Sequence, residues 1–206
     1  MLNVTFDMTC IIDLEKNNDT TPYLRKLIRM HEDREINLRV VAISASERKP
    51  DHTYASHFDE FKKRIAVVGL ADVEILTPIS YWGITFWDYS LWNGKTQEEL
   101  ERKIQGILFP TIELRYVDFC RKRGLDSDDK KAWRRWVNRK CDVLALWSHL
   151  WHDGDVFVTR DEHFHQKTKK ARLIALGAGE ILKPAEAVKL LANRPHASVH
   201  QRKVRN

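Results

Sequence analysis

The chain has 206 residues, of which 43% are hydrophobic and seven are tryptophan, so we expect one domain with a substantial core rather than a disordered chain. Three widely spaced cysteines (Cys10, Cys120 and Cys141) argue against a disulfide framework or a structural zinc site, and no segment approaches the about 18 apolar residues that span a bilayer. We therefore expect a cytoplasmic protein without a membrane partner. The net charge of +6 and the pI near 9.2 favour a polyanionic partner.

Apolar runs and break signals in the first half of the chain predict alternating strands and helices. Thr21 followed by Pro22 is a typical helix start, and Thr9 is expected to cap a first short helix. In chain order we expect a strand at 4–6, a turn into a helix at 7–12, a helix at 21–35, a strand at 38–43, a helix at 51–68 and a strand at 73–79.

The stretch from Tyr81 to Trp92 is dense in aromatic residues and has no clean period. Three interpretations are open: an insertion packed on the body of the domain, a dimer surface, or a platform on which bases stack. Packing in the core or in an interface is the favoured one.

The second half of the chain continues the alternation. Thr96 and Glu99 have the spacing of a capping box, and Ser127 is expected to cap a long helix. We expect helices at 96–107, 110–123, 127–151, 165–175 and 184–191, with strands at 156–158 and 180–182. Together these elements predict an α/β fold with a mainly parallel sheet covered by helices on both faces. Residues 1–193 would form a single domain with an aromatic insertion at about 80–95, and 194–206 a flexible basic tail.

Acidic residues follow three of the predicted strands. Asp7 follows the first strand, Glu47 the second, and Asp161 the strand at 156–158. Because the carboxyl ends of parallel strands meet at one edge of a sheet, these carboxylates are expected to converge there. Asp142 is expected near the start of a helix that points at the same edge. Oxygen ligands of this kind suit Mg²⁺ or Mn²⁺, which activate water for phosphodiester cleavage. If the second strand is misread, Glu60 or Asp59 would take the place of Glu47.

Basic residues concentrate beside these acids. From Arg121 to Lys140 there are nine Lys or Arg against three Asp, and from Arg160 to Arg172 there are five against two acids. Solvated helix faces give such runs as often as nucleic-acid contacts do, but their number tilts the interpretation towards nucleic acid. The candidate substrate contacts are Thr159, Arg160, Arg134, Arg135 and Lys140. Asp13 and Glu15 are expected on a helix surface.

The pattern of acids resembles the PIN-domain ribonucleases. Val4-Thr5-Phe6-Asp7 is similar to the first element of that family, Asp142 with the apolar residues after it to the third, and Val158-Thr159-Arg160-Asp161 to its strand-Thr-x-Asp motif. The resemblance implies a PIN-like fold in which Asp7, Glu47, Asp142 and Asp161 are catalytic and bind the metal. It further implies hydrolysis that leaves a 5′-phosphate and a 3′-hydroxyl.

Two hypotheses of different classes follow. The leading one is a metal-dependent nuclease, most simply an endoribonuclease. Small proteins of the resembled family suggest a toxin of a toxin–antitoxin pair or a defence effector. That role would bring an inhibitory protein partner, and a homodimer is a further prediction. The rival is a non-catalytic nucleic-acid-binding or scaffold protein on the same fold with an incomplete metal site. A doubly wound phosphatase is disfavoured, because no Asp-x-Asp follows the first strand and no Gly-rich phosphate loop is present.

Overall fold

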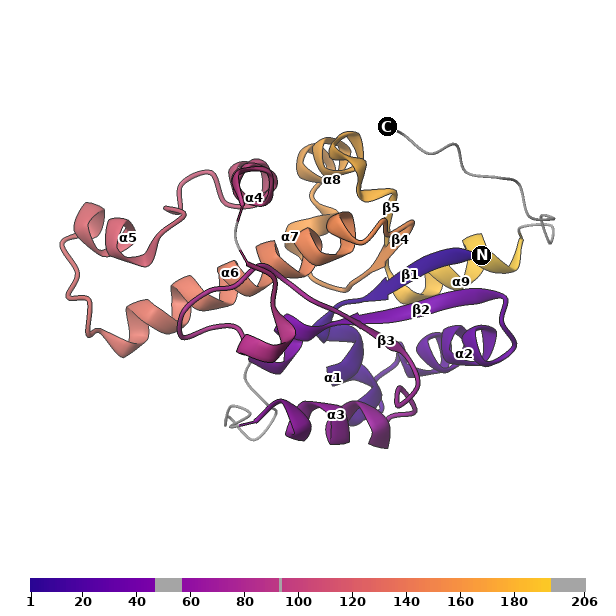
Figure 1. Cartoon of the computed structure of the whole chain (residues 1–206). Coiled ribbons are helices and arrows are strands. Elements are labelled where there is room, and N and C mark those ends of the chain that lie inside the picture. The colour runs from indigo at the N-terminus through magenta and orange to yellow at the C-terminus, as the bar shows by residue number, and fades with distance from the viewer. Residues whose placement is uncertain (47–56, 93, 194–206) are drawn as a thin grey trace.

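The computed structural model describes residues 1–46, 57–92 and 94–193 (Figure 1). In that part of the chain, five strands form one sheet in the order β3-β2-β1-β4-β5. Every neighbouring pair is parallel. The predicted α/β fold with a parallel sheet is thereby confirmed. The strands are β1 (Leu2–Phe6), β2 (Ile36–Val41), β3 (Glu74–Leu76), β4 (Val156–Val158) and β5 (Glu180–Leu182).

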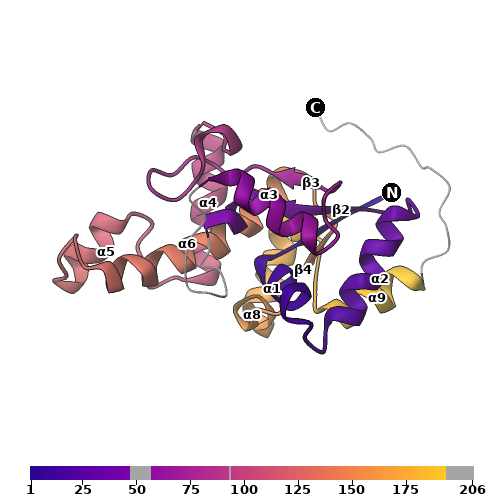
Figure 2. The same ribbon diagram turned by 90° about the horizontal axis from the view of Figure 1, so that it is seen from below.

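Helices cover both faces of the sheet, as Figures 1 and 2 show from two directions. One layer packs on the face of the sheet that carries the Val4 and Phe6 side chains of β1. It contains α1 (Met8–Lys16), α2 (Thr21–Glu32), α3 (Phe58–Val67) and α9 (Pro184–Ala192). The opposite layer contains α4 (Lys95–Leu108), α5 (Tyr116–Arg123), α6 (Lys130–Trp151), α7 (Glu162–His165) and α8 (Lys167–Leu173). Shorter helical turns are η1 (Ala42–Ser46), η2 (Trp87–Tyr89) and η3 (Ile174–Ala178).

The alternation of side chains along the central strands separates the two cores. Val4 and Phe6 of β1 belong to the core under α1 and α2, whereas Phe157 of β4 belongs to the core under α6. All three are fully buried, and each such side chain contributes about 1.5–3 kcal/mol of burial free energy. Strands this apolar on both faces are typical of a parallel sheet between two helical layers.

Several predicted helix starts are wrong by a few residues. Helix α6 is capped by Asp129 rather than Ser127, because the Asp129 carboxylate accepts the amides of Lys131 and Ala132 at 2.8 and 3.1 Å. Thr96 caps nothing, since α4 begins one residue earlier, after Gly94. Asp7 rather than Thr9 precedes α1, and Thr20 rather than Thr21 precedes α2. Helix α5 begins only at Tyr116. The predicted helix at 165–175 is divided into α7, α8 and η3.

Helix α6 runs antiparallel to the strands and extends well past their carboxyl ends (Figure 1). Its C-terminal half is anchored on β1, since the His149 Nδ1 lies 2.8 Å from the Thr5 Oγ1. Its N-terminal half therefore projects beyond the edge of the sheet where Asp7 and Asp161 follow their strands. This overhang gives the carboxyl edge of the sheet a wall on one side.

Candidate active site at the carboxyl edge of the sheet

Asp7 and Asp161 come from neighbouring strands. Phe6 is in register with Val158, so the residues that follow β1 and β4 leave the sheet side by side. The Asp7 amide donates to the Val158 carbonyl at 3.0 Å, which continues the ladder one residue past β1. The predicted placement of both acids at one edge of the sheet is thus confirmed.

Two threonine hydroxyls hold the Asp7 carboxylate. Thr159 Oγ1 donates to Asp7 Oδ2 at 2.7 Å, and Thr9 Oγ1 donates to the same oxygen at 3.1 Å. Each hydroxyl also accepts a backbone amide of the loop after β4, Thr159 from Asp161 at 3.0 Å and Thr9 from Arg160 at 3.1 Å. The orientation of Asp7 is therefore fixed to the loop that carries Asp161.

Asp7 is a buried carboxylate with an acidic neighbour. Its side chain is 4% exposed, and burial is the main cause that raises its pKa above the ordinary aspartate value. The charge of Asp161 raises the pKa further, while the bonds from Thr159 and Thr9 oppose the shift. Within residues 1–46, 57–92 and 94–193, neither Asp7 nor Asp161 forms an ion pair with a Lys or Arg. A buried carboxylate beside a second acid is stabilised either by protonation or by a bound cation.

Asp161 is half-buried and also serves as a helix cap. Its Oδ1 accepts the His163 amide at 2.7 Å at the start of α7. Its Oδ2 has no hydrogen-bond partner in the described part of the chain. The capping role explains an acid at this position without any ligand, yet it occupies only one of the two oxygens. Asp161 can therefore cap α7 and still offer an oxygen to a metal ion.

Asp142 lies in the second half of α6, so the prediction of a position near a helix start is wrong. It nevertheless lies towards the carboxyl edge of the sheet, as predicted. Positions 138, 142, 145 and 149 fall on one stripe of the helix. Along that stripe His149 and Ala145 are fully buried over the sheet, Asp142 is half-buried and Asn138 is exposed. The stripe leaves the sheet near Asp142, which puts this carboxylate at the border of the carboxyl edge.

The predicted set of four carboxylates is only partly brought together. Glu47 lies outside the described residues, directly after Ser46 at the end of η1. Of its alternatives, Asp59 and Glu60 stand in the first turn of α3, and Asp59 pairs with Lys62 at 3.9 Å. In the described ranges, no three His, Cys, Asp or Glu side chains are grouped closely enough to hold a metal ion. Two carboxylates and their threonine donors form the nucleus of the site, and their hard oxygen atoms fit Mg²⁺ or Mn²⁺.

Arg160 is engaged inside the fold, which corrects the prediction that its charge meets substrate. Its guanidinium makes two short contacts with the Asp13 carboxylate, one through Nε and one through Nη2. Asp13 is fully buried and also binds Asn18 and Thr20, so the prediction of a surface position for it is wrong too. The pair ties α1 to the loop between Thr159 and Asp161, so Arg160 positions the site.

Lys140 is likewise unavailable to a substrate. Its Nζ lies 2.6 Å from Glu101 Oε1, and both side chains are 1% exposed. The Tyr81 hydroxyl donates to the same carboxylate at 2.7 and 2.9 Å. The prediction of a substrate contact at Lys140 is therefore corrected: this residue joins α6, α4 and the aromatic stretch. Arg134 and Arg135 are exposed, as a role in binding requires.

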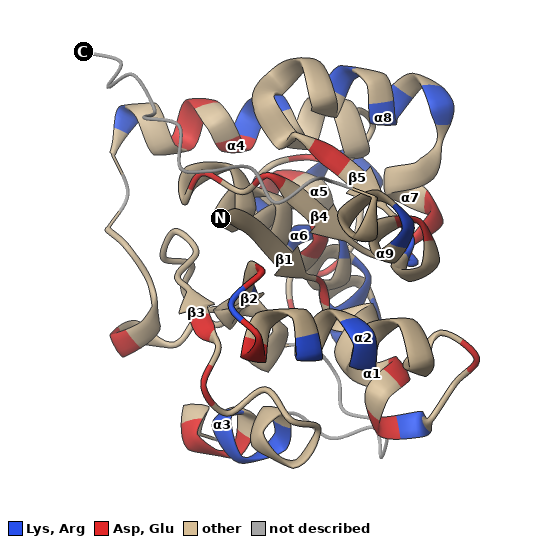
Figure 3. Ribbon diagram, turned by 90° about the vertical axis from the view of Figure 1, so that its right-hand side faces the viewer, with Lys and Arg blue, Asp and Glu red and all other residues tan. Residues whose placement is uncertain are grey.

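The basic residues of the molecule are not confined to one helix. Seen from the side of the amino ends of the strands, Lys and Arg also lie on α2, α3 and α8 (Figure 3). Two histidines flank the Asp161 loop: the His165 Nε2 lies 2.9 Å from the Thr159 carbonyl, and the His163 ring packs edge-on against Phe109. Both rings thus have contacts within the fold, although His163 is exposed.

Neither a model of a known protein family nor a curated protein sequence matches this chain. Among the helices of the described residues, none combines the length and the apolar character needed to cross a bilayer.

Proposed function

We propose that this chain is a metal-dependent ribonuclease with a PIN-like site at the carboxyl edge of its sheet. The observation that carries the proposal is the Asp7–Asp161 pair: a carboxylate that is 4% exposed lies beside a second carboxylate, with no Lys or Arg paired to either in the described part of the chain. Asp142 at the border of the same edge, and Glu47 after η1, would complete the set of ligands.

The roles of the residues follow from their positions. Asp7 and Asp161 would hold Mg²⁺ or Mn²⁺, and the hydroxyls of Thr159 and Thr9 keep the Asp7 carboxylate oriented before any ion arrives. When bound, such an ion supplies charge neutralisation and lowers the pKa of a coordinated water. The exposed Arg134 and Arg135 would hold phosphates of the substrate chain. An RNA substrate, an inhibitory partner, a homodimer and a cytoplasmic location stay predictions.

The experiment is a cleavage assay with labelled single-stranded RNA and DNA, in Mg²⁺, Mn²⁺ or EDTA. We expect RNA cleavage that requires metal and is lost in Asp161→Asn. Glu162→Gln is the matched control, because Glu162 is the adjacent acid, is exposed and pairs only with Lys183 in the described residues. Cleavage that survives in Asp161→Asn, or that proceeds in EDTA, would reject the proposed site.

A second candidate is a non-catalytic nucleic-acid-binding protein on the same fold. It is favoured by one observation: in the described ranges, no third acidic side chain joins Asp7 and Asp161 closely enough to form a metal-binding group. This candidate predicts binding of RNA that neither needs metal nor leads to cleavage under any of the conditions above.

A further inference from the structure

A hollow lies next to the candidate site, between the overhanging half of α6 and the aromatic stretch. It is a cavity of about 470 Å³, within the range of small-molecule pockets, which is about 300–1,000 Å³. Lys130, Trp133, Arg134 and Val137 of α6 form one wall. The opposite wall consists of Ser46, Gly83, Ile84, Thr85 and Phe86. Since Ser46 ends η1, directly after β2, the cavity opens at the same edge of the sheet as Asp7.

The aromatic stretch carries three exposed tryptophans beside this cavity. The side chains of Trp82, Trp87 and Trp92 are 83%, 59% and 81% exposed. Their rings touch one another, with centroids 5.6 Å apart for Trp82 and Trp87 and 6.0 Å apart for Trp87 and Trp92. A contiguous exposed apolar patch of this kind is typical of an interaction site. These three residues therefore do not pack in the core of the chain, and of the favoured interpretation, packing in the core or in an interface, only the interface stays a prediction for them.

The tryptophans stand on a rigid base. The loop closes on itself through the Leu91 amide and the Pro78 carbonyl at 2.8 Å, and the Tyr81 hydroxyl is fixed to the buried Glu101. Ser46 also donates a short hydrogen bond to the Ile84 carbonyl. The backbone that carries the exposed rings is thus fixed before any ligand binds, which reduces the entropy lost on binding.

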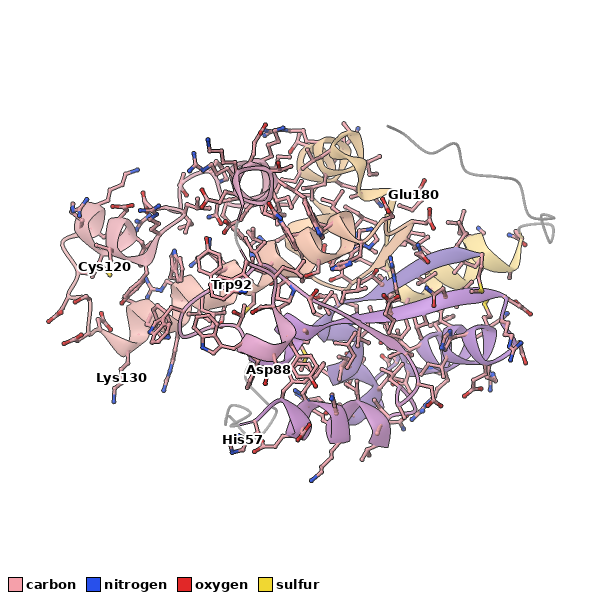
Figure 4. All side chains as sticks on the ribbon, in the orientation of Figure 1. His57, Asp88, Trp92, Cys120, Lys130 and Glu180 are labelled. Atoms are coloured by element: carbon pink, nitrogen blue, oxygen red, sulfur yellow. The ribbon has the colours of Figure 1, made fainter. Side chains whose placement is uncertain are left out.

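The loop and the basic wall approach each other closely. Gly83 has a φ of +72°, and a Cβ built there would lie 3.7 Å from the Trp133 ring. Trp82 precedes Gly83 and Trp87 follows Phe86, so the exposed rings flank residues that line the cavity. Figure 4 labels Asp88 and Trp92 of the loop and Lys130 at the start of α6. The loop that carries the exposed rings and the helix that carries Lys130 and Arg134 thus line the same cavity.

We propose that this surface, which we name the tryptophan platform (Trp82, Trp87, Trp92, Lys130, Trp133 and Arg134), binds unpaired nucleotides of a single strand. Bases stack on the exposed rings, and phosphates lie against Lys130 and Arg134. The proposal rests on the proposed function, since it identifies the single-stranded segment that leads into the candidate site. A duplex is a poor ligand for the platform, because its bases are already stacked.

The binding test uses the full chain in EDTA, so that no cleavage interferes. Fluorescein-labelled 12-nucleotide RNA, DNA of the same sequence and duplex RNA are titrated by anisotropy. We expect single strands to bind and duplex to bind at least tenfold more weakly. Trp92→Ala is expected to weaken single-strand binding about fivefold or more without changing its salt dependence, because stacking releases no counterions. Tyr23→Ala, an exposed aromatic of α2 in the other helical layer, is the control.

The cations are tested by salt dependence. Lys130→Ala should reduce the slope of log Kd against log salt concentration by about 0.7, the value for one phosphate contact of a single strand. Lys131→Ala is the matched control, because Lys131 is the exposed neighbour that does not line the cavity. The titrations with RNA and with DNA show which kind of single strand the platform prefers. If the two affinities are equal, the expected preference for RNA in cleavage arises at the carboxylate site alone.

The outcomes separate this proposal from the nuclease itself. Unchanged binding in both Trp82→Ala and Trp92→Ala overturns the platform, even when metal-dependent cleavage is found. Weakened binding in those variants supports the platform, even when no condition gives cleavage. A wild-type protein that binds no single strand but forms a dimer, which Trp92→Ala dissociates in light scattering, overturns the proposal in favour of a protein interface.

Discussion

Thr159 and Asp7, which are 152 residues apart in the sequence, are joined by a 2.7 Å hydrogen bond between the threonine hydroxyl and Asp7 Oδ2. The same hydroxyl accepts the amide of Asp161. We expect Thr159→Val to lower the free energy of unfolding by about 1–3 kcal/mol, because it removes a donor from a buried carboxylate. Thr159→Ser keeps the hydroxyl and serves as the control in urea denaturation. Equal stability of the two variants would contradict the role given to this bond.

Asp7→Asn should stabilise the metal-free protein while it removes the candidate activity. Burial and the neighbouring charge of Asp161 raise the pKa of Asp7 above its unfolded value, so the ionised carboxylate opposes folding at neutral pH. This penalty is present above the folded-state pKa and is relieved as the pH falls through it. An amide of the same shape carries no such penalty. Each kcal/mol recovered would raise Tm by about 2–4 °C for a chain of this size.

The measurement is thermal unfolding at pH 7.5 in EDTA, compared with unfolding in excess Mn²⁺. Metal should raise the Tm of the wild type and leave that of Asp7→Asn unchanged, because a ligand that binds only the folded state stabilises it. A lower Tm for Asp7→Asn than for the wild type in EDTA would show that the carboxylate is not under electrostatic strain.

Protonation of His149 should make stability fall in mild acid. Its ring is fully buried, with Nε2 3.0 Å from the Ala178 carbonyl and Nδ1 2.8 Å from the Thr5 hydroxyl. Burial lowers the pKa of His149 to about 4. Between pH 6.5 and 4 the unfolded chain therefore binds a proton at His149 that the folded chain does not bind. The free energy of unfolding is not reduced by this group above about pH 6.5. It should decrease between pH 6.5 and 4, by about 3 kcal/mol in total at 1.36 kcal/mol per pKa unit.

Urea denaturation at pH values from 7.5 to 4.5 measures this loss. His149→Gln is the comparison, because the glutamine side chain offers an NH2 donor group and a carbonyl acceptor and does not titrate in that range. The wild type should lose stability more steeply than the variant, and parallel curves would exclude His149 as the titrating group.

The buried Lys140–Glu101 pair predicts strong coupling in a double-mutant cycle. Removing one partner leaves a charge with 1% exposure uncompensated, so Glu101→Gln and Lys140→Met should each cost about 3–5 kcal/mol. The double variant should cost clearly less than the sum of the two single variants. Additive costs in chemical denaturation would show that the pair contributes no interaction energy.

The parts of the fold that the sequence predicted are those with a local signal. The strands at 156–158 and 180–182 are short apolar runs between turns, and the structure has them at those residues. Asp7 and Asp161 were identifiable because each directly follows such a run. Helix starts were less accurate, since several polar residues compete for each cap, as Ser127 and Asp129 do before α6.

Partners that are distant in the sequence were not predictable. Arg160 binds Asp13 across 147 residues, and Lys140 binds Glu101 across 39. A basic residue in a basic run gives no sign of which of its neighbours the fold buries. One signal was present for Asp13, which lies three residues after Cys10 and so on the same face of a largely apolar helix. The role of Glu47 stays a prediction, because that residue lies outside the described ranges.

The position of β1 in the sheet makes the candidate site depend on a strand that is synthesised much later. One edge of β1 pairs with β2, which lies within the first 41 residues, whereas its other edge pairs with β4 at Val156–Val158. In a nascent chain on the ribosome, Asp7 is therefore present for most of translation without Thr159 to orient it or Asp161 beside it. A chain released before β4 presents one unpaired edge of β1 and lacks Thr159 and Asp161, so truncated products are open to aggregation and lack the carboxylate pair on which the proposed activity rests.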